Sequence, residues 1–368
     1  MAQDTNGRAL SLVRIIAINV LVFFVTINLL YWAIPVVGTI SRASWRAPGP
    51  LPPNYSAADA GWARRHAEEM ARKTSVYRSY LGWQTAPMAG ETINVEGPNF
   101  QRRTSNDNTS DAKKVYFFGG STMWGVGATD ATTIPSQFAA ITGVHAENFG
   151  EIGWTAHQGL MQLIRLLQAG HRPTLVVFYD GVNDTDQKCR IEITPDAHER
   201  ERQFDETLRR SLKPDSFVHF FAPIARVGAN FNRELERWRV GPNRQYNCAS
   251  NPEKAAAIAE NLVDDWRLAK HLVELHGGQF IGLLQPVSYL SSTRLDHIDL
   301  SVEQGKQYQA VYPRVREKIA RMSGVHDLVS ALDIDEYIYF DFCHLSPNGN
   351  RYVAQKIAEI AAPLALKR

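Results

Sequence analysis

Between Lys113 and the C-terminus, short apolar runs alternate with longer amphipathic stretches, and this alternation limits the chain to one class of fold. Most of the runs are nearly continuous in apolar residues, which is typical of strands buried on both faces of a sheet. Such strands form parallel sheets covered by helices on either side, so the predicted fold class is α/β, a three-layer α/β/α sandwich with a parallel sheet. Strands are expected at 115–120, 146–150, 174–180, 279–286 and 326–332, and helices at 133–142, 156–169, 253–276, 303–322 and 347–364.

The N-terminal region contains one long apolar segment, Ile15–Ile34, without a charged residue. As a helix with a rise of 1.5 Å per residue it would extend about 30 Å, the thickness of a hydrocarbon core. We therefore expect an uncleaved transmembrane anchor at 15–36, behind a short tail at 1–14. A cleavable signal peptide is the alternative, but the segment is longer than a usual signal core, and Tyr31-Trp32 precedes no clear small-x-small cleavage site.

The orientation of this anchor is predicted from the short N-terminal tail. Two arginines lie on each side of the segment, so the distribution of positive charge does not decide the orientation. A short tail followed by the whole remaining chain favours an N-terminus inside the cell. The predicted localisation is a single-pass membrane protein whose main domain is extracytoplasmic, and periplasmic in a bacterium.

Residues 37–110 are expected to form a linker and an N-terminal extension of the main domain. The stretch 46–57 is rich in proline and is expected to be a semi-rigid linker. Helical spacing of apolar residues predicts a helix over 58–73. Residues 74–110 have no clear period, so irregular structure is expected there.

The main domain is expected at 111–368, with a polar, Arg-rich insertion at about 186–250. Cys189 and Cys248 bracket this insertion, and they are either a disulfide at its base or two unrelated buried thiols. Three cysteines without a CxxC pair indicate neither a disulfide scaffold nor a zinc site. A net charge of +2 without a basic stripe gives no case for a nucleic-acid partner.

Four polar motifs would reach the same edge of the predicted sheet, because ligands of such sheets bind beyond the carboxyl ends of the strands. They are Gly119-Gly120-Ser121-Thr122, the stretch 148–155, Gly181-Val182-Asn183-Asp184 and Asp341-Phe342-Cys343-His344. Taken singly, each has an ordinary structural explanation: a tight turn, a helix start capped by Thr155, an Asx turn and a surface ion pair.

The residue types in these motifs suit nucleophilic catalysis. The glycines before Ser121 allow a sharp turn that leaves its hydroxyl at the sheet edge. His344 can hydrogen-bond to Asp341 through one ring nitrogen and take a serine proton with the other. A glycine N–H and the Asn183 side chain can donate hydrogen bonds to a developing oxyanion. Together the motifs contain the parts of an acyl-transfer site.

In their order along the chain, the four blocks FFGGSTMWG, ENFGEIGWTAHQ, FYDGVND and DFCHLSPNGNRYVA resemble those of the SGNH (GDSL-like) hydrolase superfamily. The resemblance covers roughly residues 112–366, apart from the insertion. It implies the SGNH hydrolase fold, with a flavodoxin-like parallel sheet. It also implies Ser121 as nucleophile, His344 as general base and Asp341 as the residue that orients the histidine.

The oxyanion hole that this resemblance implies consists of the Ser121 N–H, the Gly153 N–H and the Asn183 side chain. Gly150 is the alternative glycine, but Gly153 stands at the better distance before a helix-starting threonine. The chain departs from the family pattern at Gly120, where the family's Gly-Asp-Ser has its aspartate. That aspartate belongs to neither the triad nor the oxyanion hole, so activity is expected to survive its absence.

The predicted activity is that of a serine esterase that hydrolyses an acyl ester, such as an acetyl ester, of a glycan or lipid through an acyl-serine intermediate. This chemistry requires no cofactor and no metal. Trp124, Trp154 and His157 lie beside the motifs and are candidate walls of the substrate pocket, with core packing as the alternative. Two other functions stay open: an O-acyltransferase acting on envelope polysaccharide, and a non-catalytic glycan-binding or assembly protein on a hydrolase fold. The expected partners are the acyl-ester substrate and the membrane.

Overall fold

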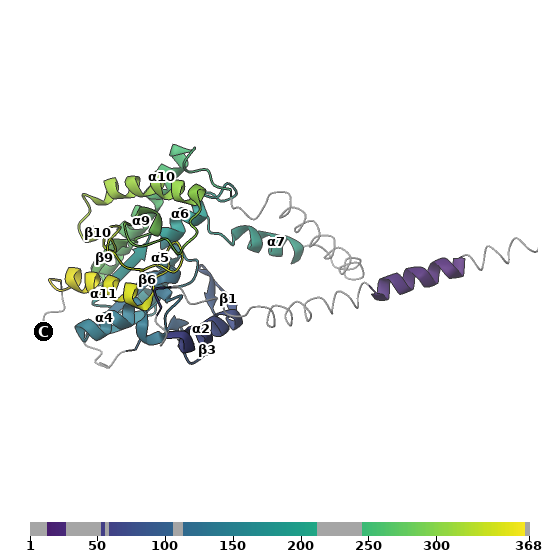
Figure 1. Ribbon diagram of the computed structural model, residues 1–368, viewed down its shortest axis with the longest axis horizontal. Coiled ribbons are helices and arrows are strands. Elements are labelled where there is room, and N and C mark those ends of the chain that lie inside the picture. The colour runs from purple at the N-terminus through teal and green to yellow at the C-terminus, as the bar shows by residue number, and fades with distance from the viewer. Residues whose placement is uncertain (1–12, 27–52, 56–58, 106–112, 212–244, 365–368) are drawn as a thin grey trace, which may run out of the picture. The chain divides into compact units, whose positions relative to one another are not determined.

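The computed structural model describes residues 13–26, 53–55, 59–105, 113–211 and 245–364 (Figure 1). The chain divides into two compact units, one of residues 1–50 and 205–244 and the other of residues 51–204 and 245–368. The described part of the first unit includes a helix at 13–26. The second unit contains the central sheet and all the residues of the candidate site.

Five parallel strands form the centre of the sheet, which confirms the predicted α/β class. They are β6 (Lys114–Gly119), β7 (His145–Asn148), β8 (Leu175–Asp180), β9 (Gln279–Leu284) and β10 (Val325–Asp327). The strand order is β10-β9-β8-β6-β7-β5-β4-β3, so the chain leaves β6 for β7 on one side and later crosses to β8 on the other. At such a switch point the loops after the strands diverge and ligand sites form.

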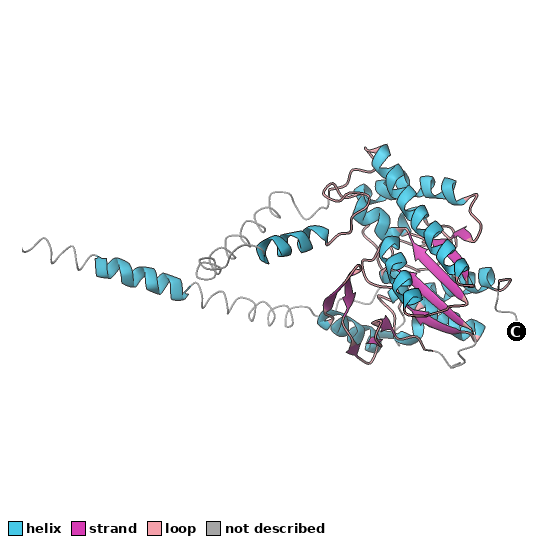
Figure 2. Cartoon of the chain, turned by 180° about the vertical axis from the view of Figure 1, so that it is seen from behind, coloured by secondary structure: helices cyan, strands magenta, loops and turns pink. Residues whose placement is uncertain are grey.

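Helices cover both faces of this sheet, so the three-layer sandwich is present (Figures 1 and 2). Tyr116 and Phe118 of β6 point into one core, and Val115 and Phe117 point into the other, as the two-residue period of a strand requires. The first core is completed by α5 (Ala156–Gln168), α9 (Pro252–Leu275) and α10 (Val302–Ile319), and the second by α4 (Ile134–Thr142) and α11 (Pro347–Ala361).

The N-terminal extension is more regular than its sequence predicts. The expected helix is present as α2 (Ala60–Arg72), but the stretch after it forms strands rather than irregular structure. Two of them, β1 (Ser75–Arg78) and β2 (Gly82–Thr85), make a separate antiparallel hairpin. The others, β3 (Met88–Ala89), β4 (Asn94–Glu96) and β5 (Gln101–Arg102), extend the central sheet in antiparallel fashion beside β7. The sheet is therefore mixed and not purely parallel.

The predicted transmembrane anchor requires a correction. None of the helices in the part of the chain that the structure describes is long and apolar enough to cross a bilayer. The described helix at 13–26 would extend only about 21 Å at 1.5 Å per residue. The prediction of a single-pass membrane protein anchored by Ile15–Ile34 is contradicted by this finding. Residues 27–36 of the predicted anchor lie outside the described residues.

Cys189 and Cys248 form a disulfide, which decides between the two alternatives that their positions leave open. Their Cα atoms are 5.2 Å apart, although 59 positions separate them in the sequence. The two chain segments also meet in an antiparallel bridge between Arg190 and Tyr246. The base of the predicted insertion is therefore closed, whereas residues 212–244 within it lie outside the described residues.

Candidate active site

Ser121 is the first residue of the short helix α3 (Ser121–Trp124), directly after β6. The turn between them needs glycine, because a β-carbon on Gly119 would lie 2.5 Å from the carbonyl oxygen of Tyr179 in the neighbouring strand. Gly119 also has a φ of +157°, in the range that favours glycine. Ser121 is therefore presented at the carboxyl end of β6, where its side chain is mostly buried.

Asp341 and His344 lie in a tight loop before α11. The Asp341 Oδ1 accepts hydrogen bonds from the backbone N–H groups of Cys343 (2.9 Å) and His344 (2.8 Å). Its Oδ2 accepts from His344 Nδ1 at 2.6 Å. Burial alone would raise the pKa of Asp341, but the hydrogen bonds and the charge of His344 outweigh it and lower the pKa. Asp341 is therefore a fixed carboxylate at neutral pH.

The other ring nitrogen of His344 faces the predicted nucleophile. Its Nε2 is 2.7 Å from Ser121 Oγ, across 223 positions of sequence. With Nδ1–H donating to the carboxylate, Nε2 is free to accept the serine O–H. The three residues form one continuous chain of hydrogen bonds, from hydroxyl to imidazole to carboxylate, in a geometry that suits proton transfer from the serine.

Asn183 lies beside Ser121, at the start of α6 (Val182–Lys188) after β8. Its Nδ2 donates to the carbonyl oxygen of Trp154 at 2.8 Å, which fixes the amide and leaves a second N–H on the same nitrogen. A β-carbon on Gly120 would stand only 2.3 Å from this nitrogen. The amide donor is therefore packed against the backbone that immediately precedes the serine.

The two candidate glycines of the second motif differ in their hydrogen bonding. The Gly150 N–H donates to Asn148 Oδ1 at 3.0 Å, so this donor is already in use. Within the described ranges, the N–H groups of Gly153 and Ser121 donate to no acceptor. Gly153 also has a φ of +78°, which favours glycine at this position. These contacts favour Gly153 over Gly150 as an oxyanion donor.

The three candidate pocket residues do not form a common wall. Trp124 and Trp154 are at most 1% exposed. They pack in the core, which was the alternative to a place in the pocket wall. The indole N–H of Trp154 donates to the Trp83 carbonyl at 2.8 Å. His157 is half exposed and pairs through Nδ1 with Asp265 of α9 at 2.9 Å, and this hydrogen bond raises its pKa.

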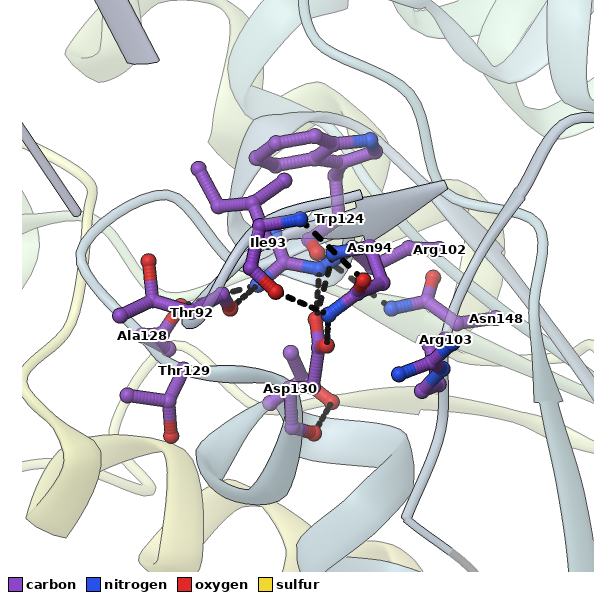
Figure 3. A network of polar contacts seen from close by, with 12 residues as sticks. Thr92, Ile93, Asn94, Arg102, Arg103, Trp124, Ala128, Thr129, Asp130 and Asn148 are labelled. Carbon is purple, nitrogen blue, oxygen red and sulfur yellow. Dashed lines mark hydrogen bonds and ion pairs between the residues drawn. The ribbon is translucent and has the colours of Figure 1, made fainter. Parts of the chain in front are cut away.

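A buried polar network, which sequence reasoning missed, supports α3 from the N-terminal extension (Figure 3). Arg102 Nε donates to Asp130 Oδ1 at 2.6 Å, and its Nη2 donates to the carbonyl oxygens of Thr92 and Ala128. The guanidinium carbon lies 4.4 Å from the ring centroid of Trp124, the last residue of α3. The only signal in the sequence is an arginine in a stretch without a period, which is too weak to place it.

Asn148 ties the same helix to the second motif. Its Nδ2 donates to the carbonyl oxygen of Met123 at 2.9 Å, while its Oδ1 accepts from Gly150. An orphan carbonyl at the C-terminal end of α3 is thereby satisfied. One side chain therefore links the helix that carries Ser121 to the loop that carries Gly150 and Gly153.

Asp341, Cys343 and His344 form a group whose possible metal-ligand atoms all lie within 4.8 Å of one another, in the part of the chain that the structure describes. Burial and the charge of Asp341 raise the pKa of the Cys343 thiol well above its ordinary value, so its sulfur stays protonated. The other two groups are already engaged, because His344 is hydrogen-bonded to Asp341 through Nδ1 and to Ser121 through Nε2. The cluster therefore suits proton transfer better than metal binding.

No protein-family model and no curated protein matches this sequence. Several solved structures are similar to it. A lipolytic protein of the G-D-S-L family from Veillonella parvula has 15% identity and a TM-score of 0.41, over 69% of this chain and 100% of its own. A carbohydrate acetylesterase family member from Sinorhizobium meliloti has 14% identity and a TM-score of 0.38, over 68% and 99%. The acetyl xylan esterase AlAXEase has 13% identity and a TM-score of 0.38, over 67% and 98%.

Proposed function

We propose that this protein is a serine ester hydrolase in which Ser121 is the nucleophile, His344 the general base and Asp341 the group that orients the histidine. The observation that carries the proposal is the unbroken hydrogen-bond chain at 2.7 and 2.6 Å between these three side chains. A serine hydroxyl is a weak nucleophile unless an adjacent base removes its proton, and this geometry supplies the base.

In the proposed reaction, Ser121 Oγ attacks the ester carbonyl carbon while its proton passes to His344 Nε2. The tetrahedral intermediate then collapses, and the departing alkoxide takes that proton from the imidazolium. A water molecule then attacks the acyl-serine while His344 takes its proton. The second tetrahedral intermediate collapses with release of the carboxylic acid, and the imidazolium returns the proton to Ser121 Oγ. Asp341 keeps the imidazole in the required tautomer and stabilises the imidazolium between these steps.

The negative charge on the carbonyl oxygen would be held by three donors: the Ser121 N–H, the Gly153 N–H and the Asn183 amide. Two of these are backbone groups without another acceptor among the described residues, and the third is fixed by the Trp154 carbonyl. Donors that are already oriented need no rearrangement as the charge develops, and this kind of preorganisation is a large part of catalysis by such sites.

The proposal is tested with p-nitrophenyl esters of rising chain length, with acetylated glycans as second substrates. Ser121→Ala is expected to lower kcat by at least about a thousandfold and to abolish labelling by a fluorophosphonate probe. Ser250→Ala, which changes an exposed serine near the disulfide, is the matched control and should behave as wild type. Ester cleavage that survives Ser121→Ala would refute the proposal. Product analysis with a glycan acceptor separates hydrolysis from acyl transfer.

A further inference from the structure

The phenyl ring of Phe340 lies parallel to the imidazole of His344. The ring centroids are 5.6 Å apart and the planes differ by 12°, an offset stacked arrangement. The two hydrogen bonds of the imidazole, to Ser121 and Asp341, run along the plane of the ring. They leave the ring free to tilt about the line that joins its two nitrogens. An aromatic ring stacked against one face opposes that tilt.

Phe340 is itself held in place by the turn after α3. A β-carbon on Gly127 would lie 2.2 Å from Cε1 of Phe340, so the edge of the phenyl ring packs directly against the glycine backbone. Gly127 has a φ of +79°, which also favours glycine. In addition, the Phe340 N–H donates to the carbonyl oxygen of His344 at 3.1 Å. The phenyl ring therefore has little room to leave the imidazole.

The N-terminal extension completes this arrangement through Tyr55. Its hydroxyl donates to the carbonyl oxygen of Gly127 at 2.9 Å, and its ring centroid is 6.1 Å from that of Phe340. Burial and the charge of Asp341 raise the pKa of Tyr55, so the phenol stays protonated and remains a donor. Next to it, Asn54 Nδ2 donates to the carbonyl oxygen of Ile338 at 3.4 Å. The extension thus contacts both the turn and the loop.

We propose that Phe340 is a positioning residue for the His344 imidazole, and that Tyr55 of the N-terminal extension keeps Phe340 in place through Gly127. This inference rests on the proposed ester hydrolysis. In that reaction the imidazole becomes an imidazolium after it takes the serine proton. An aromatic face within about 6 Å attracts a cation, so the stack favours the imidazolium that forms when the serine proton is transferred. Loss of the aromatic face should therefore lower kcat and leave KM unchanged.

The test compares Phe340→Leu, Tyr55→Phe and their combination in the full-length protein. Phe340→Leu keeps an apolar side chain but removes the aromatic face, and it is expected to lower kcat roughly tenfold with KM within about twofold. Tyr55→Phe removes only the hydrogen bond to Gly127 and should lower kcat less. Because both changes act through the same ring, their effects in the double variant should not be additive. Labelling of Ser121 by a fluorophosphonate should slow in parallel.

Phe280→Leu is the matched control, since Phe280 is a buried phenylalanine of β9 in the core beneath α5 and α9. It should lower the melting temperature without changing kcat. A kcat of Phe340→Leu within twofold of wild type, or an equal fall of kcat in Phe280→Leu, overturns the inference. If Phe340→Leu does not fold, an unchanged kcat in Tyr55→Phe overturns it instead. Since Ser121→Ala is assayed alongside, failure of this inference is distinguishable from failure of the hydrolase proposal.

Discussion

The side-chain nitrogen of Asn183 stands 2.3 Å from the position that a β-carbon on Gly120 would occupy. Real side chains do not approach so closely, so only glycine at position 120 leaves the amide in its present place. The same nitrogen is bonded to the Trp154 carbonyl, which keeps it from withdrawing. Glycine at position 120 is thereby explained, since the Asn183 amide occupies the space that a side chain there would require.

Gly120→Ala is expected to lower kcat by about a hundredfold, because the amide must shift by roughly 1 Å and oxyanion donors act only at the right distance. Gly120 has a φ of −82°, so alanine adopts the backbone there without strain. Steady-state kinetics with a p-nitrophenyl ester measure the effect. Gly61→Ala is the control, since a β-carbon at Gly61 meets no atom within 4 Å. An unchanged kcat in Gly120→Ala would remove Asn183 from the proposed oxyanion hole.

His66 is expected to make stability depend on pH. Its Nε2 accepts the N–H of Gly127 at 3.0 Å, which requires the neutral ring. Burial, together with the charge of Arg102, lowers its pKa to about 4, against an ordinary 6.5. As pH falls from 6.5 to 4, the unfolded chain binds a proton that the folded chain does not. The free energy of unfolding should therefore fall by about 3 kcal/mol across this window.

His66→Gln is the variant that isolates this contribution. The glutamine amide oxygen can still accept the Gly127 N–H, but glutamine does not titrate. Urea denaturation at pH 7 and pH 4.5 should show a smaller loss of stability in the variant than in wild type. Equal losses in the two proteins would mean that other groups cause the whole effect.

The sequence predicts the parallel core of this fold well because the signal is local. A buried parallel strand is apolar at nearly every position, and the limits of β6, β8 and β9 in the structure lie within a few residues of the predicted ones. The polar motifs after these strands converge because the fold itself delivers carboxyl ends to one edge. Ser121 and His344, far apart in the chain, meet for that reason.

Other features depend on contacts that no local pattern encodes. Trp124 and Trp154 look suited to a pocket, yet one is covered by Arg102 and the other by the β1–β2 hairpin through Trp83. The strands β3 to β5 have two or three residues each, too few for a period to appear. The stacking of Phe340 on His344 likewise requires a turn and an N-terminal segment that only the folded chain brings together.

The disulfide between Cys189 and Cys248 is expected to stabilise the domain, since it closes a loop across 59 positions. Loop-closure entropy for that length corresponds to about 4 kcal/mol. Cys189→Ser with Cys248→Ser should therefore lower the denaturation midpoint substantially, and a reducing agent should do the same to wild type. Cys343→Ser serves as the control, because that cysteine is not in the disulfide. A midpoint that reducing agent leaves unchanged would contradict the expectation.

The ion pair of Arg102 with Asp130 is expected to behave as a coupled unit. The two side chains are 0% and 10% exposed, so removing one partner leaves the other charged and buried. Arg102→Met should lower the free energy of unfolding by about 3–5 kcal/mol. Combining it with Asp130→Asn should cost less than the sum of the single changes, because the stranded charge is then gone. Urea denaturation of the four proteins measures this coupling.

A second effect of Arg102→Met should appear at Ser121. Without the guanidinium above Trp124, α3 loses one of its supports, so fluorophosphonate labelling should slow at a temperature where the variant is still folded. Arg294→Met is the matched control, because its partner Asp335 is exposed and such pairs contribute little. Additive losses of stability in the double variant would contradict the coupling of Arg102 with Asp130. Labelling at the wild-type rate would show that the network supports the N-terminal extension without positioning the serine.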